Sequence, residues 1–76
     1  SLQGVKFAVI FIESVQEDIV KISLRSKGNF SVNEFSRSHF QGGGHNNAAG
    51  GKSDLSLTET TKYFESVLKD YKSQLQ

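Results

Sequence analysis

The sequence contains no cysteine, so neither a disulfide framework nor a thiolate metal site can stabilise it. Its formal net charge is only +1, too small for a general nucleic-acid coat, in which many lysines and arginines neutralise phosphates together. Recognition of an anion must therefore depend on a local group of side chains. The longest apolar run, residues 7–12, is far shorter than the about 20 residues that cross a bilayer.

That same run is also a poor signal peptide. Lys6 precedes it, but Glu13 ends it and no small-residue cleavage site follows. We therefore expect a cytoplasmic protein with no membrane partner. What remains is an ordinary soluble composition, 36% hydrophobic and 22% charged, in a single domain of 76 residues with no repeats. A domain of this size buries only about 60% of the surface of its unfolded chain, so its stability should be modest.

The spacing of apolar residues predicts an α+β domain in the order β-β-α-loop-β-α, with a mixed sheet of about three strands. Residues 5–14 and 19–26 are rich in β-branched and aromatic residues, and a polar turn over 16–18 joins them as an antiparallel hairpin. Both faces of the first strand are largely apolar. We therefore expect a cover on each, one of which a partner domain or subunit could supply.

The helices are predicted from their caps and apolar stripes. Ser31 and Glu34 have the spacing of a capping box, which begins a helix with Phe35 and Phe40 as core anchors. Residues 54–57 are long enough for a third strand. Thr58 would then cap a C-terminal helix whose apolar residues recur at helical spacing.

Residues 42–51, with the sequence GGGHNNAAGG, are the most distinctive segment. Consecutive glycine amides can form a concave anion-binding nest, and one helical turn over 45–49 would add its dipole. His45 can donate a hydrogen bond to a phosphate or a base edge. The alternative is a flexible linker, although linkers favour Ser, Thr or Pro over His, Asn and Ala. No Lys-Ser/Thr follows the glycines and they are not spaced along a helix start, which excludes a P-loop and a usual dinucleotide fingerprint.

Arg25 is the second candidate, because its guanidinium fork can grip a phosphate and the hydroxyl of Ser26 can add a further bond. Alternatively, it is a solvated arginine at a strand end. Two histidines without clustered carboxylates make no metal site, and His39 is expected to be a packed or rim residue. Tyr63 and Tyr71 are expected to be core or interface residues.

Residues 23–28 (SLRSKG), the capped helix and residues 42–51 together resemble the first type of DHH-associated domain. This is the C-terminal domain of phosphoesterases named for an Asp-His-His motif. The resemblance implies that the chain, which begins at Ser1, is a substrate-binding domain excised from the C-terminus of a two-domain enzyme. The N-terminal catalytic domain would hold two divalent metal ions, usually manganese. Family substrates are short oligoribonucleotides, phosphoadenosine phosphate, cyclic dinucleotides and polyphosphate.

By motif matching, the resemblance assigns phosphate binding to Arg25 and Ser26. It assigns contact with the terminal phosphate or nucleotide to the glycine-histidine segment, and Gln41 stands where the family often has a fourth glycine. The expected ligand is a phosphorylated nucleotide or short single-stranded RNA, with no catalytic residue and no metal ligand in this chain. The substrate-binding residues are then Arg25, Ser26, Gly42, Gly43, Gly44, His45 and Asn47.

Two rival functions remain at this stage. The chain could be an RNA-binding or dimerising module, since similar domains end alanyl-tRNA synthetases, and a homodimer would follow from that role. The two-faced apolar first strand also suits a purely structural interface domain.

Overall fold

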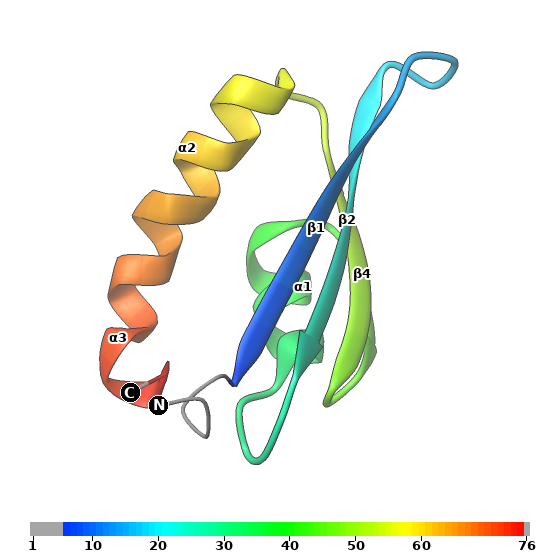
Figure 1. Ribbon diagram of the computed structural model, residues 1–76. Helices are drawn as coiled ribbons and strands as arrows, with labels where there is room; N and C mark the ends of the chain where they lie inside the picture. The colour runs from blue at the N-terminus through cyan, green and yellow to red at the C-terminus, as the bar shows by residue number, and fades with distance from the viewer. Residues whose placement is uncertain (1–5, 76) are drawn as a thin grey trace.

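The structure is a computed structural model that describes residues 6–75. A four-stranded antiparallel sheet carries the helices on one face, and no described helix covers its other face, which is called the open face below (Figure 1). The strand order is β1-β2-β4-β3. The elements are β1 (Phe7–Ser14), β2 (Ile19–Ser26), α1 (Val32–His39), β3 (Gly43–His45), β4 (Ala48–Ser53), α2 (Leu57–Leu68), η2 (Lys69–Tyr71) and α3 (Lys72–Leu75).

The predicted α+β class is confirmed, with two differences in the sheet. It has four strands rather than about three, and every pairing is antiparallel rather than mixed. The start predicted for the first strand at Val5 lies outside the described residues. No described helix is both long and apolar enough to cross a membrane.

The β1–β2 hairpin forms as predicted, with pairs running from Phe7 opposite Ser26 to Ser14 opposite Ile19. Alternation in β2 directs its larger apolar residues toward the helices, because successive strand side chains point to opposite faces. These side chains are almost completely buried, with at most 3% of their surface exposed: Val20, Ile22 and Leu24.

Aromatic rings fill the space between the sheet and the helices. Phe35 and Phe40, the expected anchors, are each 1% exposed. The ring centre of Phe35 lies 5.4 Å from that of Phe7 on β1 and 5.8 Å from that of Phe64 on α2. Ser31 caps α1 by accepting a hydrogen bond from the backbone N–H of Glu34 at 3.2 Å, as its position in the capping motif predicts.

The predictions for residues 45–58 were wrong in three places. Residues 45–49 form no helical turn, because they belong to the β3–β4 hairpin. The strand predicted over 54–57 lies earlier, at β4, and Asp54 and Leu55 are a bend. Ser56, not Thr58, caps α2, since its hydroxyl accepts from the N–H of Glu59 at 3.1 Å. Glycine and alanine carry no strand pattern of their own, so these pairings depend on tertiary contacts.

Candidate functional site

The glycine segment forms a hairpin that is hydrogen-bonded along its length to α1. The N–H of Gly44 donates to Oδ1 of Asn33 at 2.9 Å, and the hydroxyl of Ser36 donates to the carbonyl of Gly50 at 2.6 Å. At its far end the N–H of Lys52 donates to the carbonyl of Phe40 at 2.8 Å. The segment is therefore an anchored part of the fold and not a flexible linker.

Close packing against α1 explains why two of the glycines have no side chain. A Cβ added to Gly51 would lie 2.7 Å from Oγ of Ser36 and 2.8 Å from Cβ of Phe40. A Cβ added to Gly42 would collide with the carbonyl oxygen of Gly50. The amides of Gly42 and Gly44 are bonded to α1 as well, so these two do not form the concave nest of free amides that the sequence suggested.

The sheet register brings the two sequence motifs together on the open face. Arg25 on β2 pairs with Ala48 on β4, and Ala48 pairs on its other side with His45 on β3. Ala8 on β1 completes this row of four. Neighbouring strands are about 4.8 Å apart, so the backbones of Arg25 and His45 are separated by about 10 Å. Both side chains are exposed, with only the methyl group of Ala48 between them.

Ser26 and Asn47 connect the end of β2 to the β3–β4 turn. The hydroxyl of Ser26 donates to the carbonyl of Phe30 at 2.6 Å and accepts from Nδ2 of Asn47 at 3.0 Å. Nδ2 of Asn47 also donates to the carbonyl of Gly28 at 3.2 Å. These bonds fix the spacing of Arg25 and His45, and contact of either polar side chain with substrate stays a prediction.

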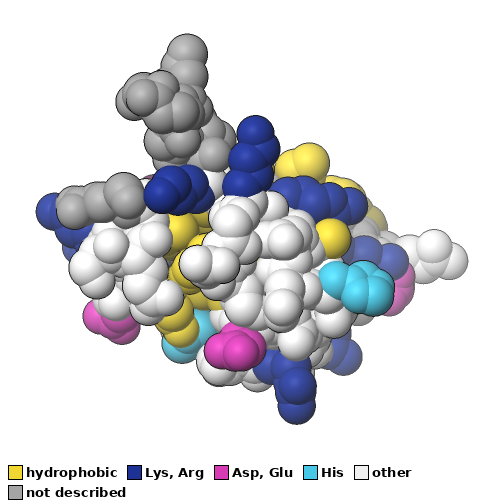
Figure 2. Space-filling model, turned by 90° about the horizontal axis from the view of Figure 1, so that it is seen from below, with side chains coloured by type: hydrophobic (Ala, Val, Ile, Leu, Met, Phe, Trp, Pro, Cys, Tyr) yellow, Lys and Arg dark blue, Asp and Glu magenta, His cyan; other side chains and the backbone are white. Residues whose placement is uncertain are grey.

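A small hollow of about 150 Å³ lies beside Arg25, and its lining includes basic residues but no acidic one. Nη1 of Arg25 donates to the carbonyl of Leu24 at 3.0 Å, which leaves most of the five guanidinium donors for a ligand. Figure 2 views the molecule from below and shows basic side chains, a histidine, hydrophobic atoms and an acidic side chain on its right-hand side. The lining consists of Lys6, Phe7, Ala8, Arg25, Ser26 and Lys27.

Two hollows near the ends of the β1–β2 hairpin differ in size and charge. Ligand pockets usually measure about 300–1,000 Å³, so the hollow of about 150 Å³ beside Arg25 is too small to enclose a nucleotide by itself. A larger hollow of about 320 Å³ beside the β1–β2 turn has three carboxylates in its lining, Glu13, Asp18 and Asp54, and suits an anion poorly. Lys6 and Lys27 were not predicted as site residues, although Lys27 follows the Arg-Ser motif on β2 and Lys6 precedes the neighbouring end of β1.

His39 and Tyr71 are packed as the sequence predicted, whereas Tyr63 is 39% exposed and is not a core residue. His39 is half-buried, with Nε2 at 2.8 Å from the hydroxyl of Tyr71 and its ring against Phe35. Burial raises the pKa of Tyr71, and the charges of Asp70 and Glu34 add to the shift. Tyr63 packs edge-on against a core ring.

Carboxylates and histidines are too scattered to build a metal centre within residues 6–75. No three of the His, Cys, Asp and Glu side chains described there come close enough to hold an ion. A two-metal centre does not fit this donor set, because the described carboxylates and histidines cannot cage two cations.

Comparison with known proteins agrees with this fold. No curated protein sequence matches the chain. The chain is 40% identical to an exopolyphosphatase-related protein from Bacteroides fragilis, with a TM-score of 0.84 over 92% of this chain. A pGpG-specific phosphodiesterase, PggH, from Vibrio cholerae shares the fold, with a TM-score of 0.67 over 90% of this chain at 10% identity. The chain spans 20% and 24% of those two proteins. The DHHA1 domain family matches residues 1–75, and the chain belongs to that family.

Proposed function

We propose that the chain is the nucleotide- and phosphate-binding domain of a DHH-type, metal-dependent phosphoesterase. Its substrates would be short oligoribonucleotides, phosphoadenosine phosphate or related phosphoesters. The observation that carries the proposal is the row in which Arg25 and His45 flank Ala48 on the open face. The two relatives support it, since one is exopolyphosphatase-related and the other is a phosphodiesterase. A cytoplasmic location stays a prediction.

In this proposal the polar side chains in and beside the row have distinct parts. Arg25 binds two non-bridging oxygens of a phosphate with its fork of donors. His45 donates a hydrogen bond to the same ligand from the opposite side of Ala48. Lys6 and Lys27 raise the local positive charge beside Arg25. The polar bridge from Ser26 to the hairpin turn keeps the two anion-binding side chains at a fixed spacing.

The catalytic step requires a second domain of a longer chain. Two divalent cations on that domain, manganese in our prediction, would activate water and stabilise the leaving oxygen. The open face is the surface on which we expect this domain to close, because Ile10 and Ile12 are 61% and 52% exposed there. This chain would contribute binding and orientation, which lower the entropic part of the barrier.

An NMR titration of the 76-residue chain with adenosine 3′,5′-bisphosphate tests the proposal. A few charge-assisted hydrogen bonds without metals predict a dissociation constant of roughly 1 mM. Shifts should begin at the amides of Ala48 and His45 and the side chain of Arg25. Arg25→Ala should abolish them, whereas Lys62→Ala on α2 should not. Shifts confined to the helices, or none at several millimolar ligand, would contradict the proposal.

The exposed isoleucines on β1 are the observation that favours the rival dimerisation or RNA-binding module. An edge strand with an apolar face can pair with a second copy. Light scattering at increasing concentration, and binding of folded tRNA compared with a dinucleotide, separate the two. A dimer that binds tRNA tightly and ignores the dinucleotide would favour the rival.

A further inference from the structure

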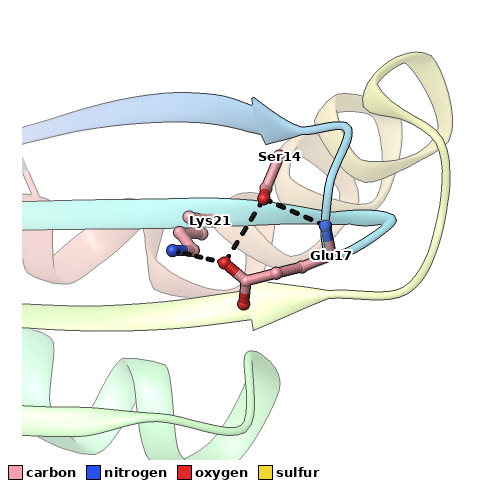
Figure 3. Close-up of polar contacts among 3 residues, drawn as sticks. All are labelled: Ser14, Glu17 and Lys21. Atoms are coloured by element: carbon pink, nitrogen blue, oxygen red, sulfur yellow. Dashed lines mark hydrogen bonds and ion pairs between the residues drawn. The ribbon is translucent and has the colours of Figure 1, made fainter.

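A second group of basic side chains lies on the open face, at the end of the sheet away from Arg25. Lys21 on β2 pairs directly with Lys52 on β4, and like charges placed opposite each other destabilise a sheet. Lys21 is bound by Glu17 at 2.8 Å, and the hydroxyl of Ser14 bonds the same carboxylate oxygen at 3.3 Å (Figure 3). Within residues 6–75 Lys52 has no ion-pair partner of its own. An unfavourable pair of this kind is typical of a functional surface.

The register places this lysine pair on the same face as the Arg25 row. Lys21 and Arg25 are four residues apart on β2, so their Cα atoms are separated by about 14 Å. The strip between them is low, because it consists of Ser23 and Gly50 in the intervening row. A Cβ on Gly50 would meet only the carbonyl oxygen of Ile22, at 3.5 Å, so this floor is open to a ligand.

Apolar side chains on β1 border the strip of small residues on β2 and β4. Ile10 pairs with Ser23 and Ile12 pairs with Lys21, which places both isoleucines beside the floor. They are 61% and 52% exposed. Among residues 6–75, the face thus offers cations at two ends, a flat middle and an aliphatic border, while the phenylalanines of β1 pack against the core.

We propose that the open face binds the sugar-phosphate backbone of a single-stranded oligonucleotide, with Arg25 and His45 at one end and Lys21 and Lys52 at the other. This inference rests on the proposed function and narrows its substrate class to a strand long enough to reach both ends. At about 3.4 Å per nucleotide, the rise of a fully stacked strand, the separation of about 14 Å corresponds to at most about four nucleotides, and an extended strand would need fewer. The isoleucine border favours bases over inorganic polyphosphate. A ligand phosphate replaces the carboxylate of Glu17 at Lys21.

The test compares two ligand lengths on the 76-residue chain. Isothermal titration calorimetry measures the affinities of 5′-phosphorylated diadenylate and pentaadenylate for the parent chain and for the Lys21→Gln/Lys52→Gln variant. The variant should bind the pentanucleotide at least about threefold more weakly than the parent chain does. Its affinity for the dinucleotide should stay within about 1.5-fold of that of the parent chain. For the pentanucleotide, the slope of log affinity against log salt should fall by about 1.4, for two lost phosphate contacts.

Matched variants separate this site from a general charge effect. Lys62→Gln/Lys69→Gln removes the same charge from exposed positions on α2 and η2, and should leave both ligands unaffected. Glu17→Gln should strengthen pentanucleotide binding, because it frees Lys21. Equal losses for both lengths, or an equal loss in the helix control, would overturn the inference.

Two further arms keep this inference apart from the proposed function. If Arg25→Ala leaves dinucleotide binding intact, the proposed function fails, whereas the length dependence judges the lysine pair alone. Inorganic pentaphosphate should bind more weakly than pentaadenylate. Equal binding, with the same sensitivity to the lysine substitutions, would overturn the assignment to nucleotides.

Discussion

The β1–β2 hairpin is built from eight-residue strands with large apolar side chains, whereas the β3–β4 hairpin consists mainly of glycine and alanine. The first is stabilised by burying side chains such as Ile22 and Leu24 against the helices. The second is stabilised by close contact and hydrogen bonds between its backbone and α1. Its small residues keep the open face low between Arg25 and His45, where the proposed ligand would approach the sheet.

The comparison predicts that adding one methyl group to the second hairpin is highly destabilising at one glycine and harmless at another. Gly42→Ala should cost about 3 kcal/mol or more, because the new Cβ overlaps the backbone oxygen of Gly50. Gly50→Ala should be neutral or stabilise by about 0.5–1 kcal/mol, since Ala restricts the unfolded chain. Urea denaturation followed by circular dichroism measures both. Equal effects would mean that backbone packing does not hold this hairpin.

The second prediction removes the hydrogen bond between α1 and the hairpin. Ser36 is fully buried and donates to the carbonyl of Gly50, so Ser36→Ala leaves that carbonyl without this donor. The expected loss in the free energy of unfolding is about 2 kcal/mol. Ser38→Ala, on the exposed side of the same helix, should change it by less than about 0.5 kcal/mol. A loss from Ser36→Ala no larger than the control would show that the bond contributes little.

The two hairpins also differ in how far the sequence predicted them. Alternating Val, Ile and Leu identify β1 and β2, and helical spacing identifies α1 and α2 through residues such as Phe35 and Phe64. Residues 43–53 carry no hydrophobic pattern, so their strands depend on pairing with β2 and on α1, neither of which is local in sequence.

The candidate site divides in the same way. Arg25 and the glycine-histidine segment were identified from residue types and from family resemblance. Their alignment in one row depends on the β2–β4 register, which no local pattern specifies. The bond between Ser26 and Asn47 likewise depends on side-chain geometry across the sheet end. Alternation along β2 did hold one further signal, since it places Lys21 on the same face as Arg25.

The third prediction compares two residues with a left-handed backbone. One lies just before the β3–β4 hairpin and the other lies in the turn of the β1–β2 hairpin. Gln41 has φ +56° at the entry to β3, and Asp18 has φ +55° in the β1–β2 turn. Gln41→Gly should stabilise by about 0.5–1 kcal/mol, because a side chain there costs about 1–2 kcal/mol and glycine's added flexibility offsets part of the gain. Asp18→Gly should gain less, since Asp tolerates this conformation. Thermal unfolding of both variants measures the difference, and destabilisation by Gln41→Gly would contradict it.

The smallest expected effect concerns the ion pair at the β1–β2 turn (Figure 3). The hydrogen bond and charge of Lys21 hold the pKa of Glu17 below its ordinary value of 4.5. Because the folded-state pKa is lowered, any stabilisation from this pair is present above pH 4.5 and is lost as pH falls through the lowered value. Both side chains are about half exposed, so Glu17→Gln should leave the melting temperature at pH 7 unchanged within error.

An NMR titration of the Glu17 carboxyl carbon measures the shift directly, where melting cannot. Lys21→Gln should return the pKa of Glu17 most of the way to its ordinary value, since Lys21 is its main cause. Lys52→Gln should produce a smaller rise in the same direction, because Lys52 acts on Glu17 only through its charge. If Lys52→Gln raised the pKa of Glu17 more than Lys21→Gln did, the main ion-pair partner of Glu17 would have to be Lys52 on β4. The first hairpin would then neutralise the second, and the free cation of the open face would be Lys21.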